Sequence, residues 1–232
     1  NGALGWSYSI DYGDGTAAVT GTTLVKSLDL SHQYADGNAN RTVGVTVTDA
    51  AGETASDSFE VSVANVAPTA AVTGADVVAE GSVYTLNVGV AADPGADTRT
   101  AYSINWGDGT TTALTAAEWA TAAGSFTHTY ADGAATPTIT VSASDEDGSF
   151  ILGSKSLTVN NVAPSVVLSG VASLNEGDTY TLNLVGSDPA GASDTLNYSI
   201  DWGDGSGVQA LTAAQLAALS GNVTHTFTDD ED

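Results

Sequence analysis

The chain has 232 residues, and its 28 acidic residues outnumber 4 basic ones, which gives a formal net charge of -24. Proteins that bind nucleic acid or anionic membranes need clustered Lys and Arg, so neither is expected as a partner. No apolar run approaches the roughly 18 residues of a membrane span. The charge indicates salty surroundings, divalent cations, or only a solubilising surface. Cys and Met are both absent; the loss of both oxidisable residues favours an extracellular protein, although the absence of Cys also fits a cytosolic one.

One acidic, glycine-bracketed phrase recurs as "YSIDYGDGTA" from Tyr8, "YSINWGDGTTT" from Tyr102 and "YSIDWGDGSG" from Tyr198. The interval from one phrase to the next, Tyr8 to Tyr102 and Tyr102 to Tyr198, is close to the length of one small domain of about 100 residues. It is too long for a solenoid unit. The sequence therefore predicts a tandem array of small domains.

The array divides into three predicted repeats. We predict the C-terminal two-thirds of a repeat in residues 1–66, one complete repeat in 67–162 and the N-terminal two-thirds of a repeat in 163–232. The chain, which has no signal peptide at its start, is thus expected to be a piece of a longer polypeptide. Its two ends should expose strand edges unless neighbouring segments cover them.

The complete repeat shows the alternation that is typical of half-buried strands. The segments "SVYTLNVGV", "TPTITVSAS" and "SKSLTVN" place apolar residues on one face and polar residues on the other. The residues expected to point inward are Tyr84, Leu86, Val88, Val90, Ile139, Val141, Ala143, Leu157 and Val159. Short alternating strands separated by Gly, Asp and Pro predict an all-β fold of antiparallel β-sandwiches.

The repeated Gly-Asp-Gly is interpreted as a hairpin turn. Gly107 and Gly109 can adopt positive φ, and Thr110 to Thr112 read as the start of another strand. A phosphate-binding loop would instead need a helix directly after the glycines. We expect no metal at this turn.

A short helix interrupts the β pattern in two repeats. In "LTAAEWATAAG", Thr115 is a candidate N-cap with Glu118 three residues later, and Gly124 ends the segment. The third repeat has the matching "LTAAQLAALSG", whereas the first has "VTGTTLVKSLDLS" and lacks the cassette. The insertion either covers the edge of the core or carries a variable function.

The combination of "YSINWGDGT", "HTYADG", "TITVSASDEDG" and "LTVNNVAP" resembles the PKD (polycystic kidney disease) repeat, an Ig-like β-sandwich. The first repeat departs from that pattern with Tyr12 in place of Trp, the third has Phe227 in place of Tyr, and the helix is an addition. The openings "AEGSVYTL" and "NEGDTYTL" are similar to bacterial cadherin-like surface repeats. The resemblance implies tandem stalks of prokaryotic surface proteins, adhesins and surface layers, or spacer modules of secreted hydrolases, and some family members bind calcium.

No residue pattern indicates catalysis. His32, His128 and His225 occupy equivalent positions, each two residues before an aromatic, and a chain seldom builds three identical catalytic bases. We therefore interpret them as packing or strand-pairing residues. No pair of carboxylates is singled out, and the chain has neither Cys nor a nucleophile-elbow Ser. We expect no enzymatic activity.

Calcium is the predicted cofactor because carboxylate, amide and carbonyl oxygens in loops are its preferred ligands. The candidate residues lie in "ADPGAD" and "SDPAGASD", in "SDEDG", before the alternating strands, and in the "NVAP" linkers. They are Glu80, Asp93, Asp97, Asp145, Asp147, Asn65, Asn161, Glu176, Asp188 and Asp194. The alternative is that these Asp residues only form turns.

The linkers join the last strand of one repeat to the first strand of the next with no flexible spacer, and their single Pro favours an extended, stiff connection. The leading hypothesis is a non-catalytic extracellular stalk, filament or adhesin spacer whose partners are neighbouring repeats, with self-assembly or surface and glycan contacts as further partners. The alternative hypothesis is a carbohydrate-binding or substrate-positioning accessory of a secreted hydrolase, which would require exposed aromatic rows.

Overall fold

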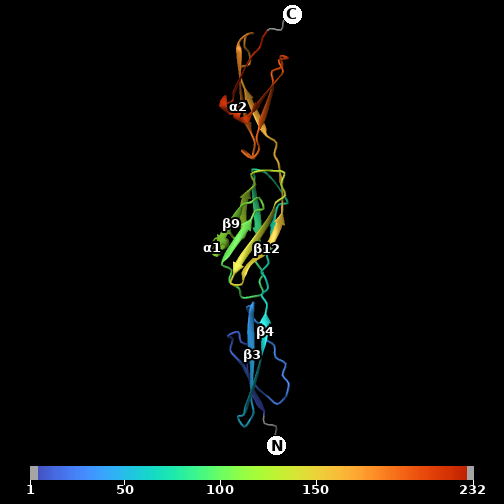
Figure 1. Cartoon of the computed structure of the whole chain (residues 1–232), viewed down its shortest axis with the longest axis vertical. Helices are drawn as coiled ribbons and strands as arrows, with labels where there is room; N and C mark the ends of the chain where they lie inside the picture. The colour runs from blue at the N-terminus through green and yellow to red at the C-terminus, as the bar shows by residue number, and fades with distance from the viewer. Residues whose placement is uncertain (1–4, 229–232) are drawn as a thin grey trace.

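A computed structural model describes residues 5–228, so the outermost parts of the first and third predicted repeats, residues 1–4 and 229–232, lie outside the described residues. The chain forms three units in a row, with its two termini at opposite ends of an elongated molecule (Figure 1). Most strand pairs are antiparallel, which confirms the predicted all-β fold of antiparallel sandwiches.

The first unit is a single antiparallel sheet with the strand order β2-β1-β3-β4. Its strands are β1 (Trp6–Asp11), β2 (Val19–Thr23), β3 (Ala39–Thr48) and β4 (Thr54–Val63). Ile10 and Val43 are buried on one face, but Phe59, which pairs with Val43, is 60% exposed. Within residues 5–228, no second sheet covers this apolar face.

The middle unit is a sandwich of the sheets β10-β7-β5 and β12-β11-β8-β9, closed by the parallel pair β6 and β13. Its strands are β5 (Val72–Gly74), β6 (Val77–Ala79), β7 (Val83–Val88), β8 (Ala101–Asn105), β9 (Thr111–Thr115), β10 (Ser125–Thr129), β11 (Thr138–Asp145), β12 (Gly148–Ser156) and β13 (Thr158–Asn160). Each sheet therefore hides the apolar face of the other.

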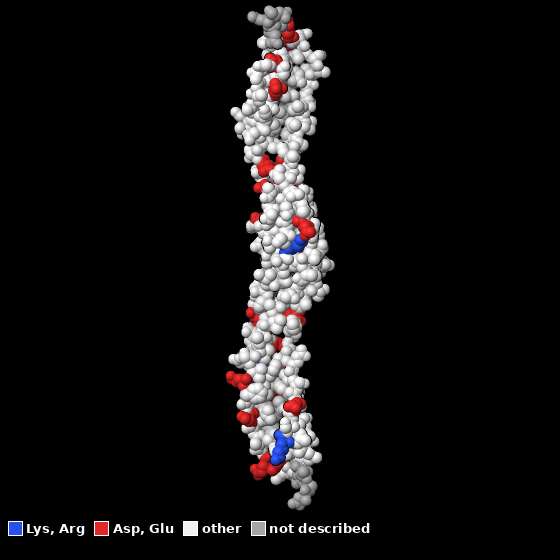
Figure 2. All heavy atoms as spheres, turned by 90° about the vertical axis from the view of Figure 1, so that its right-hand side faces the viewer, with Lys and Arg blue, Asp and Glu red and all other residues white. Residues whose placement is uncertain are grey.

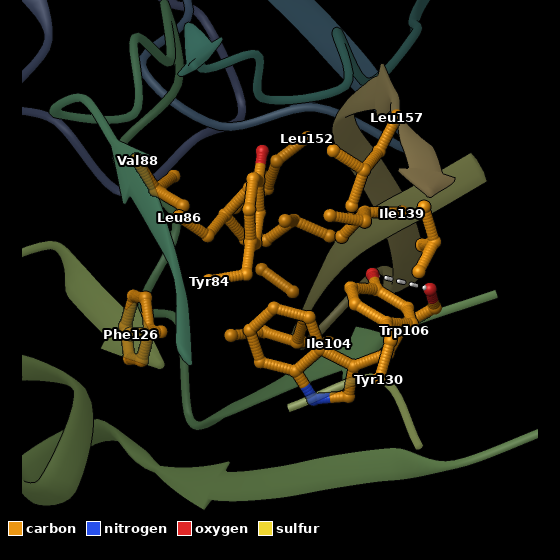
Figure 3. Packing of buried hydrophobic residues seen from close by; sticks show 13 residues of the cluster. Tyr84, Leu86, Val88, Ile104, Trp106, Phe126, Tyr130, Ile139, Leu152 and Leu157 are labelled. Carbon is orange, nitrogen blue, oxygen red and sulfur yellow. Dashed lines mark hydrogen bonds between the residues drawn. The ribbon is translucent and has the colours of Figure 1, made fainter. Parts of the chain in front are cut away.

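The core of the middle unit contains most of the residues predicted to point inward (Figure 3). Leu86, Ile139, Val141 and Val159 are completely buried, as the alternation predicts. The prediction for Val90 is wrong, because the pairing of β7 with β5 and β10 ends before it and this side chain is 96% exposed.

Trp106 is the largest side chain in this core and is 2% exposed. Its indole Nε1 donates a hydrogen bond to Thr112 Oγ1 at 2.9 Å. Its carbonyl oxygen accepts one from the Tyr130 hydroxyl at 3.0 Å (Figure 3). Both polar groups of the aromatic pair are thus satisfied inside the apolar core.

The third unit pairs β14 (Ser165–Ser169), β15 (Thr179–Ser187) and β18 (Asn222–Thr226) in one sheet, and β16 (Asn197–Asp201) with β17 (Val208–Thr212) in a hairpin. Its core is small, with Leu184, Ile200, Leu216 and Val223 buried. The described part of this unit has no counterpart of β11 and β12.

The predicted helices are present as α1 (Ala116–Ala122) and α2 (Ala213–Ala218). Thr115 accepts a hydrogen bond from the Glu118 amide while the Glu118 carboxylate accepts one from the Thr115 amide, and Thr212 forms the same capping box with Gln215. Each helix connects the two sheets of its unit. No helix within the described residues is long and apolar enough to cross a membrane.

The Gly-Asp-Gly segment forms the predicted turn between β8 and β9. Gly107 and Gly109 have φ of 81° and 91°. A Cβ on Gly107 would lie 2.8 Å from the backbone of Thr138, so both conformation and space require glycine there.

Candidate metal sites at the two junctions

Three carboxylates meet where the middle and third units join. Glu80 follows β6, while Asp188 and Asp194 come from the loop between β15 and β16, and each of the three offers an oxygen within 4.8 Å of the others. Glu80 is only 1% exposed. Its Oε1 accepts a hydrogen bond from the amide of Val162 in the linker at 2.7 Å, whereas its Oε2 has no hydrogen-bond partner. A buried carboxylate oxygen without a partner is costly, so this oxygen is suited to bind a cation.

Two glycines allow the close approach of the segments around Glu80. A Cβ on Gly133 would lie 2.4 Å from Glu80 Oε2 and 2.4 Å from Asn161 Cα. A Cβ on Gly81 would lie 2.9 Å from the side chain of Pro189 in the next unit. Glycine at both positions therefore allows the neighbouring segments to pack closely around Glu80 Oε2.

The junction of the first and middle units gathers five carboxylates in two overlapping groups. Asp93, Asp97 and Asp145 form one group, and Asp36, Asp97 and Asp147 form the other, again with oxygens within 4.8 Å inside each group. These residues come from three loops: the one after residue 34, the one between β7 and β8, and the β11–β12 turn.

The loops of this first junction are held together across the two units. The amide of Ala96 donates a hydrogen bond to the carbonyl oxygen of Ala35 at 2.7 Å. Arg99 binds Asp93 Oδ2 at 3.1 Å, but both oxygens of Asp97 are buried and have no hydrogen-bond partner. Asp97 is thus the shared, unsatisfied residue of the two groups.

Burial and, after it, mutual repulsion raise the pKa of two of these carboxylates. Burial, followed by the charges of Asp93, Asp145 and Glu146, raises the pKa of Asp97 from 3.8 to about 6. Burial likewise raises the pKa of Asp194, assisted by the charges of Glu80, Asp188 and Asp132. Acidic residues gather at the two narrow places between the units (Figure 2). A divalent cation would relieve both the burial and the repulsion.

The structure brings together seven of the ten residues predicted as calcium ligands: Glu80, Asp188 and Asp194 at one junction, and Asp93, Asp97, Asp145 and Asp147 at the other. Glu176 is exposed and lies in none of the three groups of carboxylates within the described residues. The backbones of Asn65 and Asn161 lie against Gly37 and Gly133, and Asn65 Nδ2 is buried without a partner.

Asp36 is a site residue that the sequence reasoning missed. It belongs to "YADG", which recurs with Asp132, and the charge of Asp132 contributes to the raised pKa of Asp194. The two aspartates therefore occupy corresponding positions at the two junctions. The repetition of this short motif was the available signal.

The three histidines form structural pairs with the aspartates of the Gly-Asp-Gly turns. The Nε2 atoms of His32, His128 and His225 lie 2.6 Å from Oδ2 of Asp14, Asp108 and Asp204, respectively. Each imidazole stacks on the aromatic residue before the turn, with ring centroids 3.9 to 4.6 Å apart. These contacts confirm the packing interpretation and hold each turn against the segment that carries its histidine.

The His–Asp pair should make the middle unit acid-sensitive. Burial works against ionisation of Asp108, but hydrogen bonds from Thr110 and His128 outweigh it and lower the pKa of its carboxyl. A lowered native pKa contributes stability that is present above the unfolded value of about 3.9 and is lost as the pH falls through the native value.

We therefore expect Asp108→Asn to lower the free energy of unfolding by about 1 kcal/mol near neutral pH, after allowance for solvent screening. The difference from the wild type should shrink below about pH 4. Urea unfolding between pH 3 and 7 measures it. A difference that does not change with pH would show that the charge of Asp108 is unimportant.

Comparison with known proteins finds similar solved structures but no matching family model or curated protein. A tetra-tandem repeat in the extending region of a large adhesion protein is 19% identical with a TM-score of 0.42, over 98% of this chain and 59% of that chain. Extracellular domains 3–5 of Drosophila OTK are 10% identical with a TM-score of 0.24, over 99% of this chain and 79% of that chain. The chain thus spans about 59% of the length of the adhesion-protein repeat structure.

Proposed function

We propose that this chain is a non-catalytic segment of an extracellular stalk, built from PKD-type Ig-like repeats and made rigid by calcium at the junctions between repeats. The observation that carries this proposal is Glu80, a fully buried carboxylate with one oxygen already bonded to the linker and the other free beside two carboxylates of the next unit. A cation bound there would join three segments of chain: the residues directly after β6, the linker, and a loop of the following repeat.

Calcium is the cation that fits this arrangement best. The available ligands are carboxylate and backbone oxygens from loops, which suit its large and irregular coordination shell, and neither His nor Cys belongs to the groups. At the first junction, five carboxylates face one arginine, so two ions that share Asp97 would balance the charge better than one. A prokaryotic surface protein in a salty or calcium-rich medium would meet these conditions.

The repeats would act as spacers, since the linkers between them are short and extended. β13 ends at Asn160 and β14 begins at Ser165, with Pro164 directly before the new strand. Such a connection limits bending between units. The proposal includes repeat boundaries at residues 66/67 and 162/163, as predicted from the sequence.

The alternative function, sugar binding by an accessory module, has no aromatic platform in the complete middle unit, whereas in the first unit Trp6 and Phe59 are 40% and 60% exposed and line one groove with Tyr8 and Tyr12. Trp106 is buried, and Trp119 is stacked on Tyr102 at 4.1 Å and packed against Phe126 at 4.6 Å. The Trp119 ring is thus engaged in aromatic contacts within the middle unit.

The proposal is tested by calorimetric titration of the chelator-treated chain with calcium. Glu80→Gln keeps an oxygen that can accept the Val162 amide but removes the charge, and it should weaken binding at the second junction about tenfold or more. The control is Glu176→Gln, which changes the equivalent but exposed glutamate and should bind calcium like the wild type. Equal titration curves for the three proteins, or no calcium heat at all, would refute the proposed role of Glu80.

A further inference from the structure

The third unit contains an apolar groove between β14 and β16. Its volume is about 390 Å³, and the apolar side chains along it are Val166, Leu168, Leu182, Leu184, Tyr198 and Ile200. Val166 and Leu168 are each 57% exposed although they lie on the inner side of β14. Such a face costs free energy in water and favours a partner that covers it.

The middle unit shows what covers the equivalent surface. By sequence, β8 corresponds to β16, and Ala70 and Val72 correspond to Val166 and Leu168. In the middle unit, Ala70 and Val72 pack against the core, and the amide of Ala70 donates a hydrogen bond to the carbonyl oxygen of Leu152 in β12 at 2.8 Å. The strand that lies beside β8 is β11. The β11–β12 hairpin therefore occupies the position that is a groove in the third unit.

The edge of β16 also requires a strand as its partner. β8 is paired on both sides, by β9 and β11, whereas β16 is paired only with β17 among the described residues. One edge of β16 consequently presents backbone amides and carbonyls that a helix or a lipid could not satisfy in register. In the middle unit, the matching edge is used by a strand with Ile139, Val141 and Ala143 facing inward.

We propose that the groove of the third unit binds a β-hairpin of the β11–β12 type, with its first strand added antiparallel to the free edge of β16 and its second strand lying over β14. The occupant is defined by alternating threonine or serine and β-branched or small apolar residues in its first strand, an acidic turn, and a leucine that reaches the inner side of β14. A hairpin with these features completes the sandwich of the third unit. This inference goes beyond the stalk function and does not depend on calcium.

The test adds a peptide with the sequence of residues 137–156, "PTITVSASDEDGSFILGSKS", to the full chain at concentrations where the chain alone is monomeric. Hydrogen exchange should slow in β16 (Asn197–Asp201) and β14 (Ser165–Ser169), while the first unit should be unchanged. A control peptide with Ser at the positions of Ile139, Val141 and Leu152 should protect neither strand.

A matched pair of variants tests whether the peptide binds in the groove. Leu168→Asp introduces a charge into the groove and should weaken binding about tenfold or more, whereas Val167→Asp, on the outer side of the same strand, should leave binding unchanged. Because a free peptide binds weakly if it must first fold, the same sequence fused after residue 232 through a flexible linker raises its local concentration. Absence of protection in β16 in this fused chain, or equal binding by both variants, would overturn the proposal.

Discussion

Asp97→Asn is expected to stabilise the metal-free chain at neutral pH and to weaken its response to calcium. In the metal-free protein, the ionised carboxylate of Asp97 is buried beside Asp93 and Asp145 without a hydrogen-bond partner. An amide removes that unfavourable charge. In calcium, the same substitution removes the one ligand that both groups at the first junction share, so binding there should weaken about tenfold or more.

The pH dependence of this variant has a defined direction. The pKa of Asp97 rises from 3.8 to about 6 in the folded chain. A raised native pKa means that the folded state holds its proton more tightly, so the metal-free wild type loses stability relative to Asp97→Asn as the pH rises from about 4 to about 6. The loss is complete above the native pKa.

Thermal and urea unfolding with chelator and with calcium measure both effects of Asp97→Asn. The control is Asp57→Asn, which changes an exposed aspartate of β4 outside the carboxylate groups and should alter neither the stability nor the calcium response. If Asp97→Asn lowered stability equally in both conditions, Asp97 would be an ordinary turn residue.

Trp106→Ala should have the largest effect on folding. The indole is 2% exposed, it stacks on His128 at a centroid distance of 4.6 Å, and its Nε1 is bonded to Thr112. Its removal leaves a large cavity in the centre of the complete sandwich and an unpaired hydroxyl. We expect the middle unit to lose about 3–5 kcal/mol.

The third unit offers the matched control. Trp202 makes the same stack on His225 at 4.6 Å and the same type of hydrogen bond, to Gln209 at 3.0 Å, but it is only partly buried. Trp202→Ala should therefore cost clearly less than Trp106→Ala. Urea unfolding followed by hydrogen exchange in each unit separates the two losses, and equal losses would contradict the view that the middle unit is the better packed one.

The sequence predicted local features best where a short motif carries its own physical reason. The period-two alternation located the inward residues of β7 and β11, and Thr115 with Glu118 predicted the capped helix α1. The same alternation failed at Val90 because the pattern continues after the strand pairing has ended. A pattern in sequence cannot report where its partner strands stop.

The sites depend on contacts between segments that are distant in sequence, and this limits their prediction. Acidic loops could be identified as calcium candidates, but only the packing of two units brings Glu80 to Asp188 and Asp194. Likewise, His128 of β10 lies 2.6 Å from Asp108 of the β8–β9 turn although the two residues are 20 positions apart in the sequence. The recurrence of each His and Asp at equivalent positions in the three repeats was a usable hint for this pair.

Small-angle scattering of the intact chain with calcium and with chelator tests the central claim most directly. If cations hold the two junctions, the calcium-loaded chain should have the dimensions of a straight rod of three units, and chelation should broaden the distance distribution and shorten its mean length. Glu176→Gln should behave like the wild type, and Glu80→Gln should resemble the chelated state at one junction. An identical maximum dimension and distribution with and without calcium would contradict the account.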